Sequence, residues 1–404
     1  MKLLHILFLV FALPVFAQDI RSIQLFNPKT NDETPVIDFD SQLVLRFDDL
    51  SNGSEIYRYT IKHFDRNWQD DGLFFTEFAK GSMSGMIDRF EYSFNTYQKY
   101  THYELTFPNE KLRPVISGNF ELIVYKDSAD KPLFTRKFCV VENNATVGVA
   151  VSRTSVPGNP AVNQRIEVQA ISNGNVLSEN VSSVSLNVIQ NNNWGNGRYS
   201  LKPSSSLGNR LLFQQLDLAF EGNNEFYYFN NKVLDQAYDM IASTGNSQEG
   251  NQTFLHPVWA YPLNYQYQPD VDGAFYFRRS DAGIERDANK EGDYSWVYFY
   301  LESDPFDKDI YVLGCFNQFQ PSEESKMRYD ADRKMYEAKI YLKQGFYNYI
   351  LATDDGSGVL NYGEINGSFW QTENLYQAFL YYQPFGRNYD GLAGYGEYRQ
   401  QNLK

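Results

Sequence analysis

The side chains that could do acid–base or metal chemistry are few and scattered. After residue 17 the chain carries His63, His102 and His256, and their spacing matches no zinc site, which needs three or four close ligands. His63 alternates with apolar residues of a predicted strand and precedes Asp65, which favours a core histidine bonded to a loop carboxylate. We expect His102 on a solvated strand face and His256 in a loop. The histidines therefore predict neither a metal site nor a catalytic base.

Three pairs of adjacent aspartates could supply the two carboxylates of a glycosidase: Asp48-Asp49, Asp70-Asp71 and Asp354-Asp355. Neighbouring residues of a strand point to opposite faces, and all three pairs lie near Gly or Ser, so hydrogen bonding in turns is the favoured interpretation. The segment Asp354–Gly358 lacks the alternating ligands and closing Glu of a calcium loop. The sequence also contains no nucleophile elbow and no Gly-rich phosphate loop. We predict no enzymatic activity, no cofactor and no small-molecule substrate.

Composition narrows the class of protein further. The formal net charge of −14 disfavours binding to nucleic acid or to an anionic membrane surface. Aromatic residues form 17% of the chain, with 31 Tyr and 31 Phe. This content is typical of a folded protein with a hydrophobic core and not of a disordered one. Tyr also suits sheet faces that meet a partner. Cys139 and Cys315 fall in different predicted domains, so we expect two free thiols within strands.

The first residues have the pattern of an export signal. Lys2 is followed by the apolar run Leu3–Phe16, and Ala17 ends a small-residue cleavage site. The run is too short for a membrane span of roughly 20 residues, and Gln18 replaces the Cys that lipid anchoring requires. We predict a signal peptide over residues 1–17 and a soluble periplasmic protein.

Apolar residues recur with the period of two that is typical of half-buried strands, as in Leu43, Leu45 and Phe47. Short strands, frequent turns and the absence of a sustained helical period predict an all-β fold of three consecutive immunoglobulin-like or early-set β-sandwich domains. The polar segments 142–145 and 281–293 are the predicted linkers. The predicted domains cover residues 18–142, 146–280 and 294–404.

Three groups of segments are specific through their order and spacing along the chain, although no single motif among them is specific. They are Leu342–Tyr349, Ile365–Tyr376 and Tyr381–Gly394; then Ser93–Asn109, Ser117–Phe120 and Thr135–Phe138; and Tyr261–Tyr265 with Asp272–Arg278. Together they resemble the plug proteins of the type IX secretion system of Bacteroidetes-type bacteria, over nearly the whole mature chain. The resemblance implies a non-enzymatic periplasmic protein that binds and closes the periplasmic opening of the outer-membrane translocon barrel. It also implies peripheral association with the outer membrane through that barrel.

Aromatic and arginine side chains often contribute most of the binding energy of a protein interface, and the end of the chain is rich in both. We predict the partner interface at Trp370, Tyr381, Arg387, Tyr389 and Tyr395. Arg387 could make a bidentate contact to a carboxylate at the rim of the barrel. The competing interpretation is that these aromatic rings pack the last sandwich.

An alternative function is a periplasmic carbohydrate-binding protein. The segments Val312–Asn317 and Leu342–Tyr349 resemble the early-set sandwich of starch- and glycogen-binding modules. A sugar platform would need Trp370, Tyr376 and Tyr382 to be coplanar on one exposed face.

Overall fold

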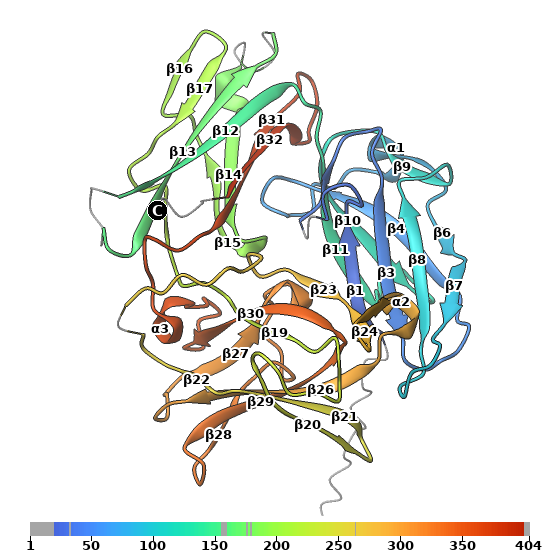
Figure 1. The fold of residues 1–404 in the computed structure, drawn as a ribbon. Coiled ribbons are helices and arrows are strands. Elements are labelled where there is room, and N and C mark those ends of the chain that lie inside the picture. Colours follow the sequence, from blue (N-terminus) through green and yellow to red (C-terminus); the bar gives the residue numbers. More distant parts are fainter. Residues whose placement is uncertain are drawn as a thin grey trace, which may run out of the picture.

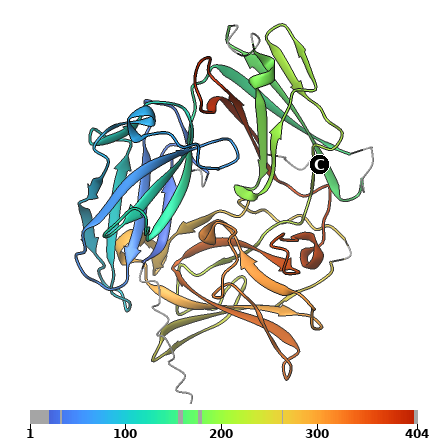
Figure 2. The same cartoon turned by 180° about the vertical axis from the view of Figure 1, so that it is seen from behind.

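The computed structural model describes residues 20–399, except 32–33, 155–159, 175–176, 178–179 and 263. The predicted signal peptide lies outside these residues. The described chain is built of strands with a few short helices, so the predicted all-β class is confirmed. Three β-rich domains surround a common centre, and each contacts the other two (Figures 1 and 2). None of the helices in the described ranges is long and apolar enough to cross a membrane.

The first domain is a sandwich of two antiparallel sheets, with strand orders β1-β3-β8-β7 and β2-β11-β10-β4-β6. Its elements are β1 (Ile20–Phe26), β2 (Val36–Ile37), β3 (Leu43–Asp49), β4 (Tyr57–Phe64), α1 (Phe75–Phe78), β5 (Ala79–Gly81), β6 (Gly85–Ile87), β7 (Arg89–Tyr92), β8 (Thr101–Phe107), β9 (Leu112–Pro114), β10 (Gly118–Tyr125) and β11 (Phe134–Val140). The one parallel pair is β2 on β11. Alternation in β4 buries Tyr57, Tyr59, Ile61 and His63 against this core.

The middle domain also has two sheets, ordered β12-β13-β17-β16, with β18 on β13, and β15-β14-β31-β32. Its elements are β12 (Ala145–Arg153), β13 (Asn163–Ser172), η1 (Val181–Ser183), β14 (Ser185–Gln190), β15 (Asn193–Leu201), β16 (Ser205–Leu207), β17 (Arg210–Phe213), β18 (Ala219–Glu221), β31 (Leu375–Tyr382) and β32 (Gly391–Arg399). Gly394 and Gly396 let β32 lie against β12, because a Cβ at Gly396 would stand 2.1 Å from the Val147 carbonyl oxygen.

The third domain lies between β18 and β31 in the sequence. Its sheets are ordered β19-β30-β23, with β27 on β30, and β20-β21-β26-β29-β28, with β22 on β26. Its elements are β19 (Tyr227–Asn230), β20 (Ile241–Ser247), β21 (Gly250–Leu255), β22 (Val258–Trp259), β23 (Phe275–Phe277), β24 (Arg279–Asp281), β25 (Ile284–Arg286), α2 (Ala288–Glu291), β26 (Tyr294–Glu302), β27 (Asp309–Leu313), η2 (Cys315–Asn317), β28 (Arg328–Asp330), β29 (Met335–Lys343), β30 (Gly345–Asp354) and α3 (Gly363–Asn366).

Sheet membership differs from the consecutive order that the sequence predicts. β19 to β25 fall largely within the predicted middle range, 146–280, yet β19 and β23 pair with β30. The last two strands fall within the predicted range 294–404, yet β31 pairs with β14 along Ser185–Gln190. The middle domain is therefore discontinuous, and the third domain is inserted into it. The physical reason is that β31 is buried on both faces, one in the core of the middle domain and the other in the cluster against the first domain.

β31 is buried on both faces because it lies between two domains. Tyr376, Ala378 and Leu380 join the core of the middle domain. Phe379 and Tyr381 point the other way, into a smaller cluster that includes Cys139 of β11. This second cluster fastens the middle domain to the first, and a bridge between Val141 and Leu392 extends the contact.

Candidate interaction surface

The histidines were the first candidates for acid–base or metal chemistry. His63 is fully buried at the end of β4, where its Nδ1 lies 2.5 Å from the Asp71 carboxylate and its Nε2 lies 3.1 Å from the Ser117 carbonyl oxygen. This matches the prediction of a core histidine bonded to a loop carboxylate. His256 is exposed in a loop, as expected.

The prediction for His102 was wrong, because the third domain covers the strand face that the sequence assigns to solvent. His102 Nδ1 lies 2.6 Å from Asp48 Oδ1, and Asp48 Oδ2 accepts hydrogen bonds from Tyr294 and Lys343, each at 2.7 Å. Burial alone would raise the pKa of Asp48, but Lys343 and His102 outweigh it and hold that pKa below its usual range. The side chains of Asp48 and Lys343 are both fully buried. This network joins the first and third domains.

The other aspartate pairs follow two patterns. Asp48 lies within β3 and bonds to the third domain, whereas Asp49 ends β3 and its Oδ1 accepts a hydrogen bond from the Ser51 amide at 2.9 Å, so the predicted turn bonding holds for Asp49 and not for Asp48. Asp70 and Asp71 likewise accept from the amides of Gly72 and Leu73, as predicted. Asp354 lies at the end of β30 and accepts hydrogen bonds from the amides of Gly356 and Gly358, which is the predicted turn chemistry. Cys139 and Cys315 are both buried free thiols, but only Cys139 lies in a strand, β11, whereas Cys315 begins the 3-10 helix η2, so the predicted strand position of Cys315 was wrong. Among the described residues, no group of three or more His, Cys, Asp or Glu could hold a metal ion.

Two of the five predicted partner residues pack on the side of β31 that faces the first domain. Tyr381 is fully buried and donates a hydrogen bond to Asn119 Oδ1 at 2.7 Å, so it connects the middle and first domains and is closed to a partner. Tyr395 is half-buried and packs on Phe379, with ring centroids 5.2 Å apart. The first domain covers the face of β31 from which Tyr381 projects and on which the Tyr395 ring packs.

Of the remaining three, Arg387 and Tyr389 share one loop, and Trp370 lies at a different junction. Arg387 is exposed in the loop between β31 and β32, and Tyr389 is half-buried with its ring 5.9 Å from that of His63. Trp370 is half-buried under the Arg153 guanidinium, at the junction of the middle and third domains. Tyr376 is fully buried and Tyr382 is 9% exposed, so these two form no exposed sugar platform with Trp370.

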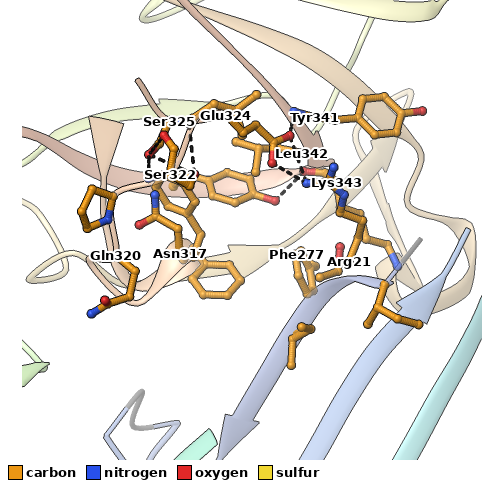
Figure 3. A pocket seen from close by; sticks show the side chains of 18 of the residues that line it. Arg21, Phe277, Asn317, Gln320, Ser322, Glu324, Ser325, Tyr341, Leu342 and Lys343 are labelled. Carbon is orange, nitrogen blue, oxygen red and sulfur yellow. Dashed lines mark hydrogen bonds and ion pairs between the residues drawn. The ribbon is translucent and has the colours of Figure 1, made fainter. Parts of the chain in front are cut away.

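The junction of the first and third domains contains a pocket of about 260 Å³. Figure 3 shows Arg21 of β1 facing Glu324, Tyr341 and Lys343 of the third domain. Arg21 donates to Glu324 at 2.7 Å, so the two charges neutralise each other. The polar groups of this pocket hold the two domains together.

The junction of the middle and third domains is acidic. Glu225 is 6% exposed, and it accepts hydrogen bonds from the Tyr265 hydroxyl and, at 3.2 Å, from the Glu373 amide. Asp272 pairs with Arg399 of β32. Burial raises the pKa of Glu225 to about 8, that of Asp270 to about 6 and that of Asp272 to about 7. Burial therefore favours the protonated forms of these three carboxyl groups.

An exposed apolar strip, absent from the predicted interface, lies along the open edge of the first domain. We call it the edge patch, and its side chains are between 40% and 68% exposed: Met83, Met86, Phe90, Tyr92, Phe94 and Tyr97. Its strands β6 and β7 are the last strands of the two sheets, at the outer margin of the first domain in Figure 1. The strip ends against the third domain, where the Phe94 amide donates to the Lys290 carbonyl oxygen at 2.8 Å and the Tyr97 amide donates to Asp293. The signal in the sequence was the alternation of Phe90, Tyr92 and Phe94 with Glu91 and Ser93, which puts three aromatic side chains on one face of a short segment.

The fold and these surfaces define a protein of three firmly joined β-sandwich domains that presents an apolar strand edge. Residues 20–142 match the family model described as the type 9 secretion system plug protein first domain. The match covers the first domain, agrees with the resemblance drawn from the sequence, and associates that domain with type IX secretion. The family is a secretion-system plug domain and not a family of enzymes.

Solved structures extend the comparison. A hypothetical protein from Parabacteroides merdae ATCC 43184, solved by crystallography, has a TM-score of 0.89 and 29% sequence identity to this chain. The likeness covers 95% of this chain and 98% of that one, so the three-domain arrangement is shared. Dimeric latent PorU from Porphyromonas gingivalis gives a TM-score of 0.13 and 8% identity, over 94% of this chain and 34% of that one, which carries no argument. No curated protein matches the chain.

Proposed function

We propose that this protein is a periplasmic plug, which binds the periplasmic opening of the outer-membrane barrel of the type IX secretion translocon and closes it between export events. The observation that carries the proposal is the match of residues 20–142 to the first domain of the plug family. A barrel wide enough for folded cargo breaches the membrane barrier when it is empty, and a steric cap restores that barrier.

The contacts between the domains support a role as a steric cap. Buried contacts connect each pair of domains: Lys343 to Asp48, Tyr381 to Asn119, and Asn193 to Tyr362 at 2.7 Å. Because every domain is held by the other two, no single junction can act as a free hinge. A body of this kind resists deformation when it blocks an opening.

Two measurements test the proposal. A deletion strain should still secrete cargo but should take up large antibiotics that the parent strain excludes, and the gene restored in trans should reverse the leak. Affinity purification of the full chain from solubilised envelopes should retain the translocon barrel. A deletion strain as impermeable as its parent, or a preparation without the barrel, would overturn the plug function.

A further inference from the structure

The edge patch combines apolar side chains with an unpaired strand edge. All four residues of β7 are exposed, and the strand pairs only with β8, on one side. Within the described residues no strand lies on its other side, so the outward backbone N–H and C=O groups of β7 are open. Such an edge is a template for another strand, and proteins usually protect it with short strands, charged side chains, proline or a cover. The segment from Met83 to Tyr97 contains no proline.

The charged residues of this edge are neutralised within the chain. Arg89 lies 2.5 Å from Glu104, Glu91 lies 3.0 Å from Lys290, and Asp88 lies 3.3 Å from Lys111. These pairs leave a strip without net charge on a protein whose formal charge is −14. The complement of the strip is an uncharged segment, because a charged partner would lose hydration here without gaining an opposite charge.

The geometry points to one kind of occupant. We propose that the edge patch binds an extended, uncharged polypeptide segment with alternating apolar side chains, which adds antiparallel to β7 as a new edge strand. Backbone hydrogen bonds would supply affinity, and Phe90, Tyr92 and Phe94 would supply the desolvated area. This inference rests on the proposed function, under which the segment belongs to the periplasmic side of the translocon barrel.

A second copy of the chain is a poorer occupant. Pairing two β7 strands would bring together two bodies that each carry a formal charge of −14. Their repulsion is only partly screened, because the Debye length is about 8 Å at physiological ionic strength. An uncharged partner segment meets the same edge without this cost.

The test compares two variants of the full chain, each of which removes two exposed apolar side chains. Tyr92→Ser with Phe94→Ser alters the patch, where these side chains are 54% and 68% exposed. Leu207→Ser with Val359→Ser is the matched control, at 79% and 73% exposed on the other domains. We expect the patch variant to retain at least tenfold less barrel in affinity purification, with an unchanged melting temperature, and the control to retain as much as the wild type.

A photo-crosslinking amino acid at position 94 identifies the occupant directly. We expect a crosslink to the barrel from position 94 and none from position 359. Crosslinks between two copies of the chain, wild-type-specific sedimentation with phosphatidylglycerol vesicles, or undiminished barrel retention by the patch variant would each overturn the proposal. In the last case the plug function still stands. If the wild type itself retains no barrel, the plug function fails first.

Discussion

At the residue scale, the Asp48–Lys343 pair fixes how the first domain meets the third. Both side chains are fully buried, and Lys343 also donates to the Asn289 carbonyl oxygen at 2.8 Å and lies over the ring of Tyr100. A buried ion pair offsets its desolvation only when its partners are all present, so it adds little net stability but strongly disfavours other arrangements. The pair therefore defines one docking geometry.

Lys343→Met should lower the melting temperature by several degrees, because removing one member of a buried pair costs about 3–5 kcal/mol. Adding Asp48→Asn should recover part of the loss, since no uncompensated charge would remain. Lys339→Met is the control on the same strand, where an exposed pair with Glu249 contributes at most about 1 kcal/mol. Differential scanning calorimetry of the four proteins measures this, and equal effects at both lysines would contradict it.

His63→Ala should act on stability and not on any turnover. The substitution leaves a cavity beside Phe120 and removes the partner of the Asp71 carboxylate, for a cost of about 1–3 kcal/mol. Chemical denaturation measures the loss, with the exposed His256→Ala as the control. A glycan or peptide that the wild type cleaves, and a stable His63→Ala protein does not, would contradict this structural role.

At the scale of elements, the loop between β31 and β32 joins a scaffold contact to an exposed tip. Tyr389 packs on His63, and Asp390 accepts from the Arg66 guanidinium at 2.7 Å, so the base of the loop is held by the first domain. Phe385 is fully exposed at the tip, near Arg387. The contacts at the base thus fix where the exposed tip stands on the surface.

Arg387→Ala should leave the melting temperature unchanged, whereas Tyr389→Ala should lower it by a few degrees, because only Tyr389 loses packing. If the tip contacts the barrel, as we propose, Arg387→Ala should also reduce copurification of the barrel. Thermal melts and affinity purification of the two single variants separate these effects. Unchanged copurification by Arg387→Ala would remove this residue from the proposed interface.

At the scale of the whole molecule, the acidic junction makes the contact between the middle and third domains depend on pH. Glu225, Asp270, Asp272 and Glu373 meet there with one cation, Arg399. Burial raises the pKa values of the first three to about 8, 6 and 7, so the folded state holds protons that the unfolded chain releases. This contribution to stability is fully present below about pH 4 and is lost as pH rises through 6 to 8.

The melting temperature should therefore fall by a few degrees between pH 5 and pH 8, and Glu225→Gln should flatten that dependence. An amide keeps the shape of the protonated carboxyl group but cannot lose a proton. Thermal melts across this pH range provide the measurement, with the exposed Glu110→Gln as the control. A wild-type melting temperature that rises steadily to pH 8 would contradict this account of the junction.

Much of the local structure could be predicted from the sequence by itself. A period of two in the apolar residues located strands such as β3, β4 and β8, since a strand with one buried face imposes that period. The same pattern placed His63 in a core, and Asp354 was correctly assigned to a turn because short carboxylates accept hydrogen bonds from nearby amides. The order of several aromatic segments indicated the plug family, which the match over residues 20–142 confirmed.

Only the tertiary structure decided which surfaces were covered. Local periodicity shows that the two faces of a strand differ, but it carries no information about a domain that lands on the polar face. The sequence pattern assigns His102 to solvent, but in the structure the third domain contributes Tyr294 and Lys343, which bond to its partner Asp48. The sequence offers Tyr381 as a partner contact, but in the structure the first domain covers its face of β31. Pairing of β14 with β31 joins residues nearly two hundred positions apart, and such long-range pairing depends on the packing of whole sheets, which no short segment encodes.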